Sequence, residues 1–319
     1  MTGNPFLFSN DNKRYHTLNY HMKSVFQKRV FKAVIDAGFT CPNLDGTKGT
    51  GGCTYCRNGS GAFTHGPDKS VEEQIRAELA RVRSKWKNAD VIAYFQSHTN
   101  TYAPLAVLRN LYEKALAQDG VCGLSIATRA DALEEDAMDY LEELSHRTYL
   151  TVELGLQSIH DCTAERINRG HTWAEFLAGY RALKARGIRV CVHMINGLPG
   201  ETAPMMIETA ETLGSLNVDA VKIHLLQIME DTVLARQYEN GEVLPMTKEE
   251  YLDIVCRQLE ELPPQTVIER ITGDGVHDKL IAPRWGVDKI AVLGAIDQTL
   301  AARDTWQGKY YKPDEKKVL

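Results

Sequence analysis

The sequence predicts an α/β fold in which parallel strands form a barrel or partial barrel. Apolar, strand-like runs alternate with amphipathic helical patterns along the first 230 residues, and this unit repeats six times. Strands that alternate with helices pair in parallel through right-handed crossovers. The 319 residues are 43% hydrophobic and 25% charged, which is the composition of an ordinary globular protein. Catalytic groups of such a barrel lie at the carboxyl ends of its strands.

The expected elements follow in a regular order along the chain. Apolar runs predict strands at residues 30–36, 91–96, 123–128, 149–156, 188–195 and 220–226. Amphipathic stretches predict helices at residues 71–86, 105–117, 134–144, 172–185 and 203–213. After residue 230 the alternation gives way to a helix at 251–261, a short strand at 266–271 and a helix at 289–303. We therefore expect a basic and aromatic N-terminal arm (1–29), a barrel (30–230) and a C-terminal extension that covers it (231–319).

Three cysteines lie in one Gly-rich segment directly after the first strand: Cys41, Cys53 and Cys56. Three thiolates hold three irons of a [4Fe–4S] cube and leave the fourth iron open to a substrate or cofactor. The Cys53-x-x-Cys56 pair alone also fits zinc or a redox pair. Zinc needs a fourth ligand, for which His65 is the nearest candidate, and a redox pair does not explain Cys41. The pattern favours an iron–sulfur site.

Further chemical groups lie at or near the ends of the other strands. Gln96 and Thr128 end the second and third strands, Glu153 and Gln157 lie on the fourth, His193 lies on the fifth, and Leu225 lies at the end of the sixth. The carboxyl ends of parallel strands meet at one edge of a barrel. We expect these ends to converge on the cysteine loop.

Charge gives a weaker indication. The formal net charge of −5 does not indicate a nucleic-acid binder, yet residues 12–35 hold no Asp or Glu and interleave six Lys or Arg with aromatic residues. Such a stretch fits an RNA-contacting arm, or a solvated basic face whose aromatics pack on the domain. No apolar run reaches the length of a membrane span, no signal peptide is evident, and the seven cysteines are odd in number. We expect a cytoplasmic protein with no membrane partner.

Several separate motifs carry a family resemblance. The cysteine loop, ELGLQS at 153–158, INRGHT at 167–172 and GLPGET at 197–202 resemble the radical S-adenosylmethionine (SAM) superfamily. RYHTLNYHMK at 14–23 and IDAGFTCPN at 35–43 are similar to the small bacterial YhcC-type proteins of its Elongator-catalytic-subunit-like branch. The resemblance covers about residues 14 to 310 and implies a partial (β/α)6 TIM-type barrel.

The chain departs from the family pattern in three places. Eleven residues separate Cys41 from Cys53, where the usual spacing is CxxxCxxC, although the Elongator-like branch tolerates a long interval. Gln96-Ser-His98 stands where many members have Gly-Gly-Glu, which contacts the SAM amino group. We expect no acetyltransferase domain after the barrel, so the Elongator acetyl-transfer reaction is not carried over.

The resemblance implies a cofactor site. Cys41, Cys53 and Cys56 would hold a [4Fe–4S] cluster whose open iron binds SAM, and cleavage of SAM would yield a 5′-deoxyadenosyl radical. Arg169 would pair with the SAM carboxylate, and Glu153, Gln157 and His193 would contact ribose and adenine. Gln96, Thr128 and Leu225 complete the cofactor-binding candidates, and no residue that handles the substrate is identified.

The resemblance also suggests a substrate, namely tRNA at the C5 side chain of its wobble uridine. The step would convert a carboxymethylaminomethyl group to aminomethyl, with flavodoxin or ferredoxin as an electron donor. The basic arm and the basic tail (Lys309, Lys312, Lys316, Lys317) agree with an RNA partner. Two alternatives remain open: a radical SAM enzyme acting on a small metabolite or porphyrin-like substrate, and a non-catalytic iron–sulfur or zinc-stabilised RNA-binding module.

Overall fold

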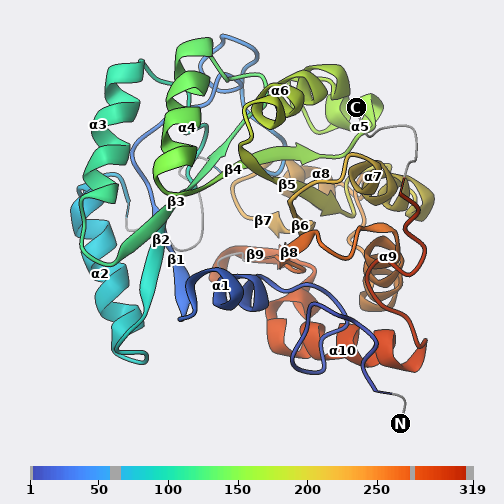
Figure 1. The fold of residues 1–319 in the computed structure, drawn as a ribbon. Coiled ribbons are helices and arrows are strands. Elements are labelled where there is room, and N and C mark those ends of the chain that lie inside the picture. Colours follow the sequence, from blue (N-terminus) through green and yellow to red (C-terminus); the bar gives the residue numbers. More distant parts are fainter. Residues whose placement is uncertain (1–2, 58–65, 274–276, 314–319) are drawn as a thin grey trace. The chain divides into compact units, whose positions relative to one another are not determined.

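The computed structural model describes residues 3–57, 66–273 and 277–313 (Figure 1). His65, Lys316 and Lys317 therefore lie outside the described residues. The main sheet has seven strands in the order β1-β2-β3-β4-β5-β6-β8. The β1–β2, β2–β3, β3–β4 and β6–β8 neighbours pair in parallel. Parallel strands that alternate with helices confirm the predicted α/β class.

The chain divides into two compact units. The first unit comprises Met22–Leu156 and Asn168–Cys191, and the second comprises Met1–His21, Gln157–Ile167 and Val192–Leu319. The boundaries cut through helix α1 (Leu18–Phe26), the end of β4 and the middle of β5. The division into arm, barrel and extension stays a prediction.

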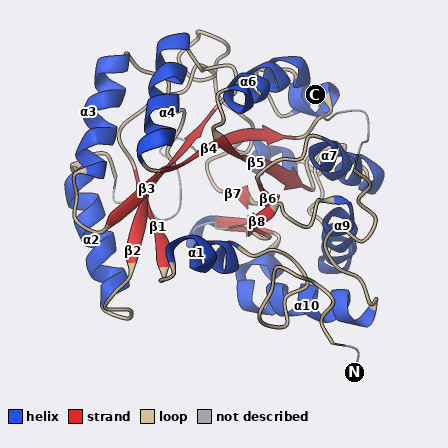
Figure 2. Ribbon diagram, viewed as in Figure 1, coloured by secondary structure: helices blue, strands red, loops and turns tan. Residues whose placement is uncertain are grey.

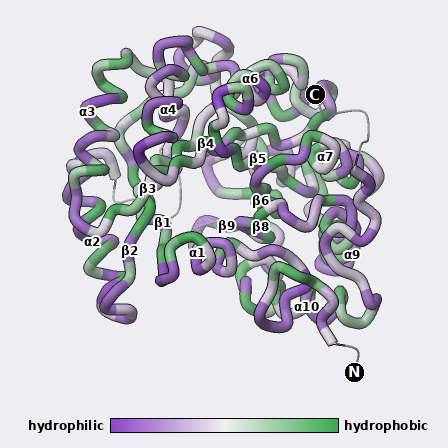
Figure 3. The backbone as a smooth tube through the Cα atoms, in the orientation of Figure 1, coloured by the Kyte–Doolittle hydropathy of each residue, from purple (hydrophilic) through white to green (hydrophobic). Residues whose placement is uncertain are grey.

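The first unit holds four strands and the helices that follow them. Its strands are β1 (Val30–Ile35), β2 (Asp90–Phe95), β3 (Val121–Thr128) and β4 (Tyr149–Gln157, whose last residue belongs to the second unit). Its helices are α2 (Val71–Arg83), α3 (Leu105–Leu116), α4 (Glu135–Arg147) and α6 (Trp173–Ala185). Figure 1 shows α2, α3 and α4 along one side of these strands. Figure 3 shows β2 as a hydrophobic stretch, in keeping with five buried residues among its six.

The second unit holds the remaining elements, which Figure 2 distinguishes by type. Its strands are β5 (Arg189–Asn196, from Val192 on), β6 (Ala220–Leu225), β7 (Ile228–Met229), β8 (Val267–Arg270) and β9 (Leu280–Ala282). Its helices are α5 (Asp161–Arg166), α7 (Ala203–Ser215), α8 (Val233–Glu239), α9 (Lys248–Glu261) and α10 (Lys289–Ala302), with short 3-10 turns at His277–Lys279 and Arg284–Val287.

The prediction of six sheet strands was incomplete. The short strand expected at 266–271 pairs in parallel with β6, with Ala220 opposite Val267 and Val221 opposite Ile268, and becomes the seventh strand. The N-terminal segment secures its other side, because Ile268 donates its N–H to His16 O at 2.7 Å. The C-terminal extension therefore contributes to the sheet itself.

Local signals fix where three of the helices begin. Ser70, Thr172 and Thr247 each begin a helix with a reciprocal capping box, in which the side chain accepts from the N3 amide and the N3 Glu bonds back. Thr172 starts α6 directly after the INRGHT motif and so fixes where that motif ends. No helix in the described ranges is long and apolar enough to cross a bilayer.

Candidate functional site

The loop after β1 carries the three motif cysteines, all with free thiols. Cys53 is buried, Cys41 is half-buried and Cys56 is exposed. The long interval between the first two cysteines folds back on itself, because Asp45 and Thr50 form an antiparallel bridge. Gly52 N–H also donates to Asn43 O at 2.9 Å. An eleven-residue interval is therefore compatible with a single site.

A second segment, Asn168-Arg169-Gly170 (the NRG segment), holds this loop. The Asn168 side chain donates to Gly52 O at 2.7 Å and to Thr50 O at 3.1 Å. In return, Asn43 Nδ2 donates to Asn168 O at 2.6 Å. Asn168 and Gly170 have φ of 51° and 70°, a left-handed conformation that asparagine and glycine adopt most readily. The NRG segment thus turns sharply against the cysteine loop.

The Arg169 side chain lies against the buried cysteine. Its Nη1 is 3.8 Å from Cys53 Sγ, its Nη2 donates to Gly155 O, and only 6% of the residue is exposed. A hydrogen bond from the Cys56 thiol and the Arg169 guanidinium hold the pKa of Cys53 well below its ordinary value, although burial acts to raise it. Cys53 is therefore disposed to be a thiolate, the form that binds metals.

A buried ion pair holds the backbone of the NRG segment in place. Arg129 donates to Arg169 O at 2.8 Å and to Gly170 O at 3.0 Å, and it forms a two-point bond with Asp131 at 2.9 and 2.8 Å. Although burial acts to raise it, the hydrogen bonds and charge of Arg129 hold the pKa of Asp131 below its ordinary value. Burial, with the charges of Arg169 and Arg129, lowers the pKa of His171 to about 4, so its imidazole is neutral at pH 7.

The structure places the predicted cofactor residues in two groups. Gln96, Thr128, Glu153 and Arg169 share the first unit with the cysteine loop, while Gln157, His193 and Leu225 belong to the second unit. Gln96 directly follows β2, and Thr128, Gln157 and Leu225 are the last residues of β3, β4 and β6. Thr128 Oγ1 lies 2.6 Å from Thr101 Oγ1. The loops after β1 and β2 are joined where Thr99 N–H donates to Thr40 O at 3.1 Å.

Gln157 combines a strained backbone with an unused acceptor. Its φ is 77°, which is uncommon for a residue other than glycine. Its Oε1 is buried and has no hydrogen-bond partner among the described residues. Strain and a free buried acceptor occur together at ligand sites more often than elsewhere.

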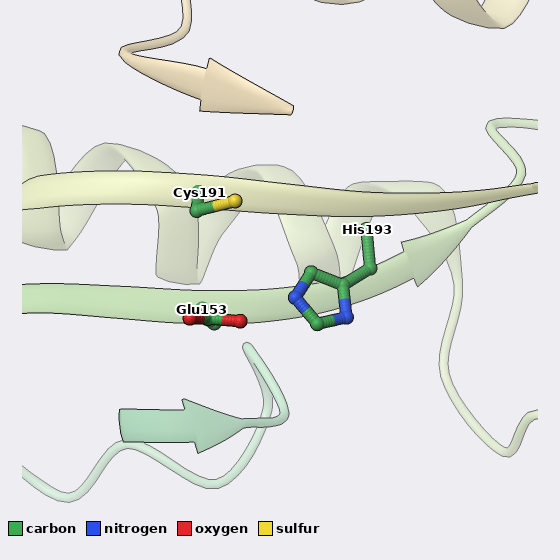
Figure 4. Close-up of side chains that lie close together, drawn as sticks. All are labelled: Glu153, Cys191 and His193. Atoms are coloured by element: carbon green, nitrogen blue, oxygen red, sulfur yellow. The ribbon is translucent and has the colours of Figure 1, made fainter. Parts of the chain in front are cut away.

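Glu153 lies in the middle of β4 rather than at its end, and it is fully buried. Lys32 of β1 forms an ion pair with its Oε1 at 2.5 Å, and the Ser125 hydroxyl donates to the same oxygen. Figure 4 shows Glu153 on one strand and Cys191 and His193 on another, all three with atom types that bind metals. Because Lys32 already neutralises the carboxylate, we assign no metal to these side chains.

Sequence reasoning assigned no individual role to several residues that shape the site: Lys32, Asn43, Arg129, Asp131 and Asn168. Asn43 and Asn168 lie inside the CPN and INRGHT motifs, so their place in the motif was the available signal. The pairing of Lys32 with Glu153 joins strands β1 and β4, which are not neighbours in the sheet, and no local pattern indicates it.

The site fits a bound inorganic group. Three thiols share one loop, and three buried polar atoms around them have no partner among the described residues, namely Asn43 Oδ1, Thr54 Oγ1 and Arg169 Nε. Buried polar groups are normally satisfied. The loop therefore presents metal ligands together with unused hydrogen-bonding capacity.

Two relatives match nearly the whole chain. The YtqA protein of Bacillus subtilis is 48% identical over 98% of this chain and 97% of its own length. The YhcC protein of Escherichia coli is 34% identical over 86% of this chain and 88% of its own. These matches confirm the predicted resemblance to YhcC-type proteins.

A more distant relative covers part of the chain. The tRNA uridine(34) acetyltransferase of Methanocaldococcus infernus is 29% identical over 47% of this chain and 28% of its own length. Among solved structures, the Elp3 protein of Methanocaldococcus infernus superposes with a TM-score of 0.68, at 18% identity, over 87% of this chain and 64% of that chain. This likeness confirms the partial-barrel fold.

Two family models divide the chain between them. Residues 46–213 match the model of the radical SAM superfamily, and residues 218–302 match that of the radical SAM C-terminal domain. The first match alone spans more than half of the chain. This protein therefore belongs to the radical SAM superfamily of enzymes, which use a [4Fe–4S] cluster and S-adenosylmethionine.

Proposed function

We propose that Cys41, Cys53 and Cys56 hold the [4Fe–4S] cluster. The observation that carries this assignment is the arrangement of three free thiols in one loop, with Asn43 and Arg169 directed at the Cys53 sulfur. When bound, the cluster and SAM together supply a 5′-deoxyadenosyl radical that abstracts hydrogen from a substrate carbon. The chain's own residues bind and orient these groups and exclude water.

The SAM contacts in this proposal follow from position and unused polar atoms. Gln157 offers its buried Oε1 to an amino or hydroxyl group, and Arg169 keeps its Nε for a carboxylate. Gln96, Thr128 and the apolar Leu225 lie at strand ends, where barrel enzymes bind ligands. Glu153 and His193 lie deeper in the sheet, before the ends of β4 and β5, and in this proposal they contact the ribose and adenine.

The substrate in this proposal is tRNA, at the C5 side chain of its wobble uridine. The likeness to a tRNA uridine(34) acetyltransferase over about half of the chain supports it. The reaction would convert carboxymethylaminomethyl to aminomethyl, with flavodoxin or ferredoxin as the electron donor. The proposal places the protein in the cytoplasm, where free thiols stay reduced.

The basic stretch at residues 12–35 supports RNA binding less than its composition suggested. Its aromatics pack internally: Phe26 lies edge-on to Tyr149, and Phe31 stacks on Trp86 at 4.9 Å. Four of its cations already pair with carboxylates: Lys13 with Asp297, Arg14 with Asp304, Lys28 with Asp90 and Lys32 with Glu153. The exposed cations of the stretch are Lys23, Lys28 and Arg29, of which Lys28 is the one already paired with a carboxylate.

Anaerobic reconstitution with iron and sulfide, followed by reduction with SAM and an assay for 5′-deoxyadenosine, tests the assignment. Cys53→Ala should abolish iron binding and SAM cleavage. Cys162→Ala, which removes an exposed thiol outside the loop, should leave both intact. Equal iron content in the Cys53→Ala protein would contradict the three-cysteine site.

The substrate is tested separately, in cells and with purified tRNA. Deletion of the gene should change the wobble-uridine nucleosides detected by mass spectrometry, and undermodified tRNA should stimulate 5′-deoxyadenosine release. An unchanged nucleoside profile would shift the assignment to a small metabolite. An intact cluster with no SAM cleavage, with or without tRNA, would favour a binding module.

A further inference from the structure

The Cys53 sulfur receives side-chain donors from two sequence-distant segments. Asn43 Nδ2 lies 3.8 Å from Cys53 Sγ, and Arg169 Nη1 lies at the same distance. These separations are in the range of hydrogen bonds to sulfur. Cys53 is also the buried member of the three, with 6% of its surface exposed. Charge placed on this sulfur is therefore stabilised by protein groups rather than by water.

Bonds that do not involve a cofactor hold the Asn43 donor in place. The second hydrogen of Asn43 Nδ2 is used by Asn168 O at 2.6 Å. Two glycines make room for its amide oxygen, since an added Cβ at Gly49 or Gly170 would lie 2.3 or 2.5 Å from Asn43 Oδ1. The amide is thus fixed in orientation before any cofactor binds.

The Arg169 donor is fixed in the same way. Its Nη2 donates to Gly155 O on β4, while its own carbonyl accepts from Arg129 Nη1 at 2.8 Å. Arg129 is in turn locked by its two bonds to Asp131. A guanidinium held at a buried sulfur acts through a low dielectric, where its charge is screened little.

We propose that Asn43 and Arg169 are positioning residues that raise the reduction potential of the cluster by donating to the Cys53 sulfur. Reduction adds an electron whose charge is shared by the cluster and its thiolates, so donors and a cation at one thiolate favour the reduced form. Hydrogen bonds to the sulfurs and local charge are known determinants of iron–sulfur potentials. The inference rests on the proposed three-cysteine site, and it assigns the two residues a role besides any contact with SAM.

A redox titration of the reconstituted protein without SAM, monitored by electron paramagnetic resonance, tests this role. Asn43→Ala and Arg169→Gln should each move the midpoint to a more negative potential, and Arg169→Gln should move it further because it also removes a charge. Arg169→Lys keeps the charge and should recover part of the shift. The matched control is Asn168→Gly, which removes the bonds to Thr50 and Gly52 but keeps the backbone carbonyl that orients Asn43, and should leave the midpoint unchanged.

The outcomes separate this inference from the proposed function. A wild-type protein that binds no cluster after reconstitution would defeat the three-cysteine site itself. Clusters with one common midpoint in wild type, Asn43→Ala and Arg169→Gln would overturn the inference and leave the site standing. An equal shift in Asn168→Gly would show that loop position, not the sulfur bonds, sets the potential. Folded Asn43 and Arg169 variants that hold no iron would also overturn tuning, in favour of a role in assembly.

Discussion

Gly170→Ala should weaken the cysteine loop through one identifiable contact. Gly170 has φ of +70°, and an added Cβ would lie 2.5 Å from Asn43 Oδ1 and 3.1 Å from Asn43 Cγ. The Asn43 amide therefore has to move. Its movement breaks the 2.6 Å bond to Asn168 O that ties the loop to the NRG segment.

The expected loss of unfolding free energy in Gly170→Ala has two parts. A left-handed conformation costs an alanine about 1–2 kcal/mol relative to glycine. Displacing Asn43 costs about 1–3 kcal/mol more, because a buried hydrogen bond is lost and its partner is left unsatisfied. Gly187 isolates the first part, since it also has φ of +70° and an added Cβ there meets nothing within 4 Å. Gly187→Ala should therefore destabilise the first unit by the backbone cost alone.

Urea unfolding of the metal-free proteins, followed by circular dichroism, gives the difference between the two variants, and iron content after reconstitution reports the site. We expect Gly170→Ala to lose about 1–3 kcal/mol more than Gly187→Ala and to bind less iron. If the two variants lose the same stability and both bind iron like wild type, the Asn43 contact does not hold the loop and the reasoning fails.

Three further predictions concern the support of the site and the fold around it. Arg129→Ala removes the two-point partner of the buried Asp131 carboxylate and leaves it Lys48, 3.7 Å away, so we expect a loss of about 3 kcal/mol in urea unfolding, the low end for a broken buried ion pair, with Arg129→Lys in between. Neutral His171 contributes stability that is complete above its unfolded-state pKa of 6.5 and is lost as the pH falls toward about 4. At about 1.4 kcal/mol per pKa unit, this loss amounts to about 3 kcal/mol. His171→Gln should remove this loss from the pH dependence of the unfolding free energy measured between pH 7 and 4. Gly179→Ala in α6 would place a Cβ against the backbone carbonyl of Ala130 and should destabilise by about 1–3 kcal/mol. Gly294→Ala in α10 meets nothing within 4 Å and should stabilise by about 0.5–1 kcal/mol. Equal thermal midpoints for this pair would contradict the packing argument.

The predicted strands and helices of the barrel lie where the periodicity indicated, because each strand is an apolar run long enough to be unambiguous. The seventh strand was missed as a sheet member because β7 and α8 lie between β6 and α9 and interrupt the regular alternation of strand and helix. Helix α5 has six residues, too few for a helical period to emerge. Short elements depend on tertiary contacts, which a local pattern does not contain.

The cysteine loop could be predicted because cysteine itself identifies a metal ligand. The roles of Asn43 and Arg129, which support the loop, could not be predicted in the same way, because their hydrogen bonds span 125 and 40 or 41 residues of sequence. Asparagine and arginine at these positions also read as a turn former and a surface charge. Only the fold shows that both point inward, toward the segment that positions Cys53.

A basic stretch of sequence likewise says little about RNA binding until the fold shows which of its cations are exposed. Residues 12–35 have a basic and aromatic composition, yet Lys32 of β1 forms an ion pair with the fully buried Glu153. A cation that neutralises a buried carboxylate is unavailable to a phosphate, and removing it would leave that carboxylate unpaired. The exposed remainder, Lys23, Lys28 and Arg29, includes Lys28, which already bonds Asp90. Each phosphate contact on a single strand contributes about 0.7 to the slope of log affinity against log salt concentration. Three cations, one of which is already paired, therefore contribute little electrostatic binding energy. The proposed tRNA substrate would therefore be recognised mainly by groups outside residues 12–35.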